Sequence, residues 1–166
     1  MSAPIIWILI PLAIAGLLII LNARAKLTGW IAAISCALLA ILAGVVTIGT
    51  PIRVASLTID ISDTLVLLGR RLVLNDGDQG FLAMFYTLGA VWFLGAQTAR
   101  ANRLFVPLGM MMLALLVAAR SVEPFLYAAL LVEMAVLISL PMLSPPGTPT
   151  GKGLMRYLVF QTLAMP

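Results

Sequence analysis

Residues 124–143 read PFLYAALLVEMAVLISLPML, a run of twenty positions with one charged side chain, Glu133. Proline suits the first turn of a helix, and the run is as long as the roughly 20 apolar residues that cross a bilayer as a helix. The whole chain has the same character, because 63% of its 166 residues are hydrophobic and only 10% are charged. A soluble domain of this size cannot bury so large an apolar fraction. The sequence therefore predicts an integral membrane protein.

Similar apolar stretches flank this run on both sides. Hydropathy and length predict five full membrane spans and the start of a sixth, at residues 4–21, 28–48, 81–97, 104–119, 124–143 and 153–166, the last incomplete. The expected fold class is all-α, a polytopic transmembrane helix bundle that forms one domain over residues 1–166. A signal peptide is the alternative for the first stretch, although no Lys or Arg precedes it and its apolar run is long for that role.

Residues 50–80 form the one polar insert between two spans. Residues 57–62 alternate between apolar and polar side chains, which is typical of a half-buried strand. Residues 63–74 fit either a second strand or an amphipathic helix on the membrane surface. Residues 75–78 read NDGD, and this cluster predicts a turn. A calcium loop is the alternative for these residues, but it needs more ligands and a distal glutamate.

The distribution of charge predicts the orientation of the chain. Three alternate connections carry basic residues and no acidic ones: Arg24 and Lys26, Arg100 and Arg103, Lys152 and Arg156. The opposite connections mix basic residues with Asp and Glu. Positive connections stay in the cytoplasm, so we expect an extracytoplasmic N-terminus and insert, in a multi-pass protein of the bacterial plasma (inner) membrane.

The same composition restricts the partners and the chemistry. The net charge is +4, but the cations are scattered rather than clustered, which argues against nucleic-acid binding. Cys36 is the only cysteine and there is no histidine, so an internal disulfide and histidine-based haem, zinc or nucleophilic sites are excluded within these residues. We expect no cofactor in this chain. Redox chemistry would belong to other subunits, and activity as an enzyme stays open.

Glu133 is the candidate site residue, because it lies midway along its apolar run. An acid at the bilayer centre costs about 2.5–3.5 kcal/mol on insertion scales, and such residues usually mark ion or proton paths. We therefore predict a proton relay. Arg156 and Lys152 are secondary candidates at the start of the sixth stretch. The alternative is a structural glutamic acid that stays neutral and donates a hydrogen bond to a neighbouring helix.

A family resemblance rests on this region. Residues 119–121 (ARS) and 130–141 (LLVEMAVLISLP), followed after a short loop by residues 154–161 (LMRYLVFQ), resemble the fifth and sixth helices of antiporter-like membrane subunits. Such subunits occur in respiratory complex I, the proton-pumping NADH–quinone oxidoreductase, in membrane-bound hydrogenases and in Mrp-type cation–proton antiporters. Upstream of residue 104, only the hydropathy pattern agrees. The family's complete fold has more helices, so the resemblance is to its N-terminal portion.

By position, Glu133 matches the family's key glutamate. The resemblance implies proton translocation coupled to a lysine on a later helix, an outside N-terminus and a polar element after the second helix. The partners implied are the lipid bilayer, other membrane subunits of a larger complex, and protons or monovalent cations. A different class stays open, in which the chain is a membrane scaffold or assembly subunit that transports nothing. A substrate-binding transporter is disfavoured, because Pro107 and Pro141 lie near helix ends rather than mid-membrane.

Overall fold

The computed structural model describes residues 2–21, 25–48, 52–54, 57–59, 62–67, 69–99, 101–143 and 151–163. Over these residues it is mostly helical, at 79%, with six α-helices. These are α1 (Ile10–Ile20), α2 (Ala25–Val45), α3 (Gln79–Thr98), α4 (Phe105–Ser121), α5 (Leu126–Leu143) and α6 (Lys152–Leu163). A short π-helix, η1 (Ile5–Leu9), leads directly into α1.

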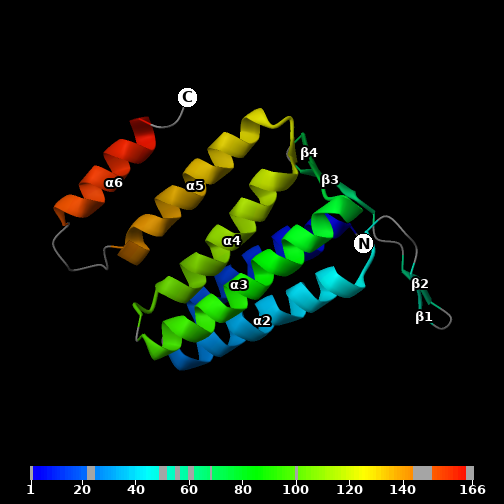
Figure 1. Ribbon diagram of the computed structural model, residues 1–166, viewed down its shortest axis with the longest axis horizontal. Helices are drawn as coiled ribbons and strands as arrows, with labels where there is room; N and C mark the ends of the chain where they lie inside the picture. The colour runs from blue at the N-terminus through cyan, green and yellow to red at the C-terminus, as the bar shows by residue number, and fades with distance from the viewer. Residues whose placement is uncertain are drawn as a thin grey trace.

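The helices lie side by side in an elongated bundle, with the short strands gathered at one end (Figure 1). The closest pairs are α2 with α3, α4 with α5, and α1 with α4. The N-terminus and the junction of α4 with α5 lie at the strand end, which we call the insert end. The helix α6 stands beside α5 and makes only sparse contacts with the other elements. The bundle proper is therefore formed by α1 to α5.

Small side chains allow α2 and α3 to approach closely. Ala32, Cys36 and Ala43 of α2 are fully buried, whereas Trp30 and Ile41 on the other side of the helix are more than half exposed. Small residues at such contacts are typical of membrane helices, because association in lipid depends on close packing. The sequence thus gives α2 one face for α3 and another that faces away from the bundle.

Two buried polar side chains of the bundle each donate a hydrogen bond to a backbone carbonyl of another element. The hydroxyl of Tyr86 on α3 donates a hydrogen bond to the backbone carbonyl of Trp7 in η1. The indole Nε1 of Trp7 in turn donates to the carbonyl of Leu39 on α2, at 3.3 Å. Both side chains have no exposed surface. Because an unpaired polar group is costly in an apolar interior, these bonds fix η1 against α2 and α3.

The expectation of five full spans and the start of a sixth is not supported. Among the residues that the structure describes, three helices are long and apolar enough to cross a membrane: Leu27–Val45, Asp76–Thr98 and Leu126–Leu143. The apolar helices Ile5–Ile20 and Phe105–Ser121 are shorter, and α6 has only 12 residues. The sequence estimate was too generous because it counted apolar runs shorter than about 20 residues, such as 104–119, as full spans. The third span is instead longer than expected, because its apolar helix begins before residue 81.

The insert is built from two β-hairpins rather than a surface helix. Strands β1 (Ile52–Val54) and β2 (Leu57–Ile59) pair with each other, and β3 (Thr64–Leu67) pairs antiparallel with β4 (Arg70–Val73). Gly69 turns the second hairpin at a φ of 75°, a left-handed value that favours glycine. Residues 63–74 therefore contain strand rather than a surface helix, but they form two paired strands instead of the single second strand that was the alternative. The fold is accordingly not purely α.

The strands of the second hairpin connect the insert to the bundle. The short strand β5 (Val122–Glu123), between α4 and α5, pairs with β4 to give the sheet order β3-β4-β5. The predicted turn at residues 75–78 contains a 3-10 helix, η2 (Asp76–Asp78), held by a capping box between Asn75 and Asp78. The insert is thus joined to the start of α5, the helix that carries Glu133.

Candidate functional site

Glu133 lies on the outer side of α5. The inner side of this helix packs on α4 through Ala128 and Ala135, which are buried. Successive helical residues are rotated by about 100°, so Glu133 lies about 200° around the helix from Ala135 and points away from α4. The structure accordingly leaves Glu133 exposed. Ionisable residues inside spans usually face a protein interior or a water-filled cavity; within the described residues, no other element covers Glu133.

An exposed apolar stripe surrounds this carboxyl. Four apolar side chains share the outer side of α5 with Glu133 at helical spacing. They are Leu126 (80% exposed), Leu130 (53%), Met134 (45%) and Leu137 (51%). Only 11% of the α5 span is buried, against 44% for the α2 span. We call these five residues the α5 stripe. It is the one exposed helix face of α1 to α5 with an ionisable side chain in its middle.

The two secondary candidates do not join Glu133. Lys152 and Arg156 are both exposed on α6. Within the part of the chain that the structure describes, the one ion pair joins Arg120 to Asp78 and involves neither residue. The loop at residues 144–150, which connects α5 to α6, lies outside the described residues, as do Arg24 and Arg100. The structure therefore does not supply a counter-charge for Glu133 from this chain's described residues.

A second polar site lies at the insert end. A guanidinium nitrogen of Arg120, in the last turn of α4, is 2.8 Å from a carboxylate oxygen of Asp78. The Asp78 side chain is only 8% exposed, whereas that of Arg120 is 58% exposed. The pair borders a cavity of about 430 Å³ that Asn75, Ser121 and Glu123 also line. This polar cavity lies at the insert end of the bundle, where the ion pair of Asp78 with Arg120 joins η2 to α4.

A cation–π contact joins the insert to α5 as well. The guanidinium carbon of Arg70 on β4 lies 3.8 Å from the centre of the Tyr127 ring, in the first turns of α5. Sequence analysis missed both this contact and the ion pair of Arg120 with Asp78. The sequence shows opposite charges near the ends of neighbouring spans, but it contains no pattern that predicts the pairing of β4 with β5.

No metal site is apparent in the described residues. They contain no group of three or more His, Cys, Asp or Glu side chains that could hold an ion. The calcium alternative for residues 75–78 finds no support there, because the Asp78 carboxylate accepts a hydrogen bond from the Asn75 backbone and pairs with Arg120. The arrangement uses this acid to hold the turn.

Comparisons with known proteins add no relative. No protein-family model, curated protein or solved structure matches this chain. The family resemblance therefore rests on residues 119–141 and 154–161 themselves. What the structure adds is the position of Glu133, in the middle of α5 and on the side that faces away from the bundle.

Proposed function

We propose that this chain is the N-terminal part of a proton-translocating antiporter-like subunit, in an NADH–quinone oxidoreductase-type or related membrane complex, with Glu133 as its proton relay. The observation that carries the proposal is the depth of Glu133 along α5. At 1.5 Å per residue, it lies about 10 Å from Leu126 and about 15 Å from Leu143. It is the only charged residue of this 18-residue span.

The exposure of Glu133 supports a role that needs a partner. An ionised carboxylate facing lipid at this depth is costly, so the α5 stripe must be covered by protein or lie against water. A cation beside the carboxyl favours its charged form, and apolar surroundings favour its neutral form. A neighbouring helix that brings a lysine close would make Glu133 release a proton, and withdrawal of the lysine would let Glu133 take one up again. Within this chain, the candidates for such a cation remain Arg156 and Lys152.

The proposal includes an orientation. Four of the described acidic residues lie at the insert end: Asp63, Asp76, Asp78 and Glu123. In the sequence, the helix connections of the other end (residues 22–26, 99–104 and 144–152) contain Lys and Arg but no Asp or Glu, which supports a cytoplasmic location for that end and an outside N-terminus. In this reading η1 with α1, and α4, cross the bilayer with the three longer helices, because they run alongside them in one bundle. The protein is then a multi-pass protein of a bacterial plasma membrane.

Replacing Glu133 with glutamine tests the relay. Glutamine keeps the size and hydrogen bonding of the side chain but cannot release a proton. We expect the assembled complex to contain the Glu133→Gln chain at normal abundance and to pump protons poorly in inverted membrane vesicles. Glu123→Gln is the matched control, because Glu123 is exposed at the insert end and outside the spans. Equal pumping by the two variants would refute the proposal.

A scaffold function is the second candidate, and the exposed α5 stripe favours it. An apolar face with one polar group in its middle fits a contact with another membrane subunit, in which a neutral Glu133 donates a hydrogen bond. In that case Glu133→Gln leaves pumping unchanged, whereas Glu133→Leu lowers the amount of assembled complex. If Glu133 is a proton relay, Glu133→Gln instead lowers pumping and leaves the amount of assembled complex unchanged. Complex abundance measured beside pumping therefore separates the two functions.

A further inference from the structure

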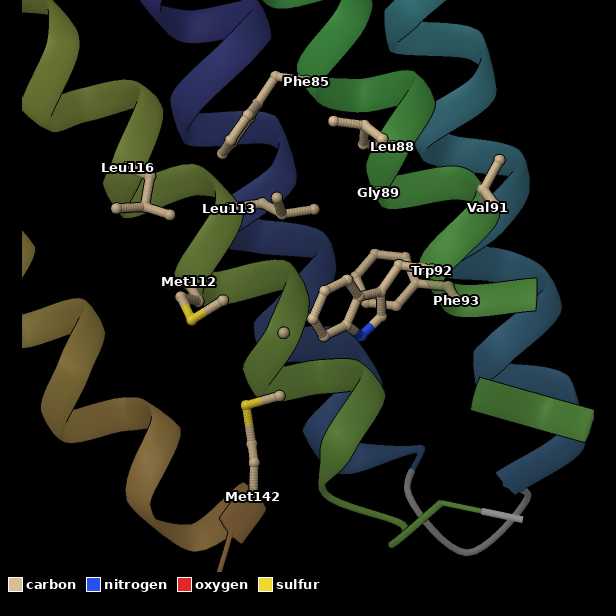
Figure 2. A pocket seen from close by; sticks show the side chains of 11 residues that line it. Phe85, Leu88, Gly89, Val91, Trp92, Phe93, Met112, Leu113, Leu116 and Met142 are labelled. Atoms are coloured by element: carbon tan, nitrogen blue, oxygen red, sulfur yellow. The ribbon is translucent and has the colours of Figure 1, made fainter. Parts of the chain in front are cut away.

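An apolar groove runs along the bundle between α3 and α4. Figure 2 shows it bordered by Phe85, Leu88 and Trp92 of α3 and by Leu113 and Leu116 of α4. Met142, near the end of α5, lines it at the end away from the insert. Its volume is about 380 Å³, and every residue that lines it is apolar. The indole N–H of Trp92 is the one side-chain polar group among the residues that line it.

The groove is open toward the side of the bundle. Leu88, Val91 and Trp92 on its wall are 58%, 63% and 57% exposed. All three belong to α3, within the apolar helix Asp76–Thr98, whose length fits a membrane span. An opening on this side therefore faces the hydrocarbon of a bilayer. A helix is about 10 Å wide and fills 380 Å³ within a single turn, so the groove is too small to seat one.

A basic residue lies beyond the end of the groove that Met142 lines. Phe105, the first residue of α4, stacks on Trp92 with ring centres 6.1 Å apart, and exposed Arg103 precedes it by two residues. Arg103 makes no ion pair with any described residue. The helix connections of this end, residues 22–26, 99–104 and 144–152, contain no Asp or Glu in the sequence. A cation without an acid nearby is thus placed at the level where lipid headgroups lie.

We propose that this groove binds an acyl chain of an anionic phospholipid, with the lipid phosphate on Arg103. The apolar walls match the chain, and the cation at one end matches the headgroup. Basic residues near helix ends attract anionic lipids, and an arginine hydrogen-bonds phosphate oxygens well. The site does not involve Glu133, so it stands or falls independently of the proton relay.

Tryptophan fluorescence can test the site in the full chain, reconstituted into phosphatidylcholine vesicles. Trp92 lines the groove, Trp30 is 55% exposed on α2 and does not line it, and Trp7 is buried. A Trp30→Phe protein therefore reports on the groove, and a Trp92→Phe protein reports on ordinary lipid contact. Each is mixed with the same small fraction of acyl-brominated phosphatidylglycerol or acyl-brominated phosphatidylcholine, because bromine quenches tryptophan on contact.

We expect brominated phosphatidylglycerol to quench Trp92 more than brominated phosphatidylcholine does, and the two lipids to quench Trp30 equally. Adding Arg103→Gln to the Trp30→Phe protein should weaken the preference for phosphatidylglycerol about five-fold, the effect of one basic residue near an anionic membrane. Arg71→Gln, the same loss of charge at the insert end, should leave it unchanged. Equal quenching of Trp92 by both lipids, or a preference that survives Arg103→Gln, would overturn the site.

A groove-filling variant separates a bound chain from headgroups gathered at the surface. Leu116→Phe adds volume inside the groove and leaves Arg103 in place. If an acyl chain occupies the groove, this variant loses the preferential quenching of Trp92. Preferential quenching that persists in Leu116→Phe would show surface attraction only and would refute the groove. Unchanged quenching of Trp30, measured in the Trp92→Phe protein with the same substitution, verifies that the bundle is intact.

Discussion

Removing the carboxylate of Asp78 should destabilise the bundle more than removing its partner's charge. Asp78 makes two interactions: an ion pair with Arg120 at 2.8 Å, and a capping bond that its carboxylate accepts from the Asn75 backbone at 3.1 Å. Because Arg120 is 58% exposed, water screens the ion pair to about 0.5–1 kcal/mol. Loss of a helix-capping side chain adds about 1 kcal/mol. We therefore expect about 1.5–2 kcal/mol for Asp78→Ala.

The variants Arg120→Gln and Asp76→Ala set the scale for this comparison. Arg120→Gln removes only the ion pair and should cost about 1 kcal/mol or less. Asp76 is an exposed acid two residues earlier, and its carboxylate accepts a hydrogen bond from the Gln79 side chain. Asp76→Ala should therefore lower the stability less than Asp78→Ala does. Unfolding of the detergent-solubilised protein in rising denaturant measures the loss of stability in all three variants. The double variant Asp78→Ala/Arg120→Gln then gives the coupling energy between Asp78 and Arg120.

High salt distinguishes the two interactions of Asp78. The coupling between Asp78 and Arg120 should shrink as the ionic strength rises, while the capping part of the Asp78→Ala effect should persist. An Asp78→Ala effect no larger than that of Asp76→Ala would show that neither interaction holds the insert end. A coupling energy of zero at low salt would show that the ion pair does not form.

Two further substitutions test the packing of α3. Gly89→Ala places a new carbon 2.6 Å from a methyl of Leu113 on α4, whereas Gly95→Ala meets no atom within 4 Å. Both changes raise helix propensity by up to about 1 kcal/mol, but only Gly89→Ala must displace a neighbouring side chain, so it should be about 1 kcal/mol less stable than Gly95→Ala. Equal stability of these two variants in detergent would contradict the close approach of α3 and α4. Tyr86→Phe leaves a buried backbone carbonyl without its donor and should cost about 1–3 kcal/mol; an unchanged denaturation midpoint would contradict that hydrogen bond.

The sequence predicts the helices of this fold better than it predicts their partners. The apolar runs locate α2, α3 and α5, because about 20 apolar residues leave few alternatives to a spanning helix. The ends are less certain, since apolar residues such as Leu104 lie outside the helix that follows them. The alternation at residues 57–62 indicated strand, but no local pattern indicated that β4 would pair with β5. That pairing joins residues far apart in the chain.

The candidate site shows the same division. Glu133 stands out in the sequence because it is the one charge in a long apolar run, and its depth along α5 follows from counting residues. The direction in which Glu133 points could not be predicted, because apolar residues such as leucine, valine and alanine occupy every face of the helix. Only the packing of Ala128 and Ala135 on α4 determines which way it points. The ion pair of Asp78 with Arg120 likewise depends on where α4 ends relative to η2.

The most direct test of the proton relay is the number of protons pumped per electron pair when Glu133 is changed in two ways. The measurement compares Glu133→Asp, which keeps an ionisable carboxyl, with Glu133→Gln, which does not, in inverted vesicles with equal amounts of assembled complex. The account predicts that the aspartate variant retains part of the pumping and that the glutamine variant pumps fewer protons than either the aspartate variant or the unaltered complex. Glutamine and aspartate variants that pump as many protons as the unaltered complex would contradict it.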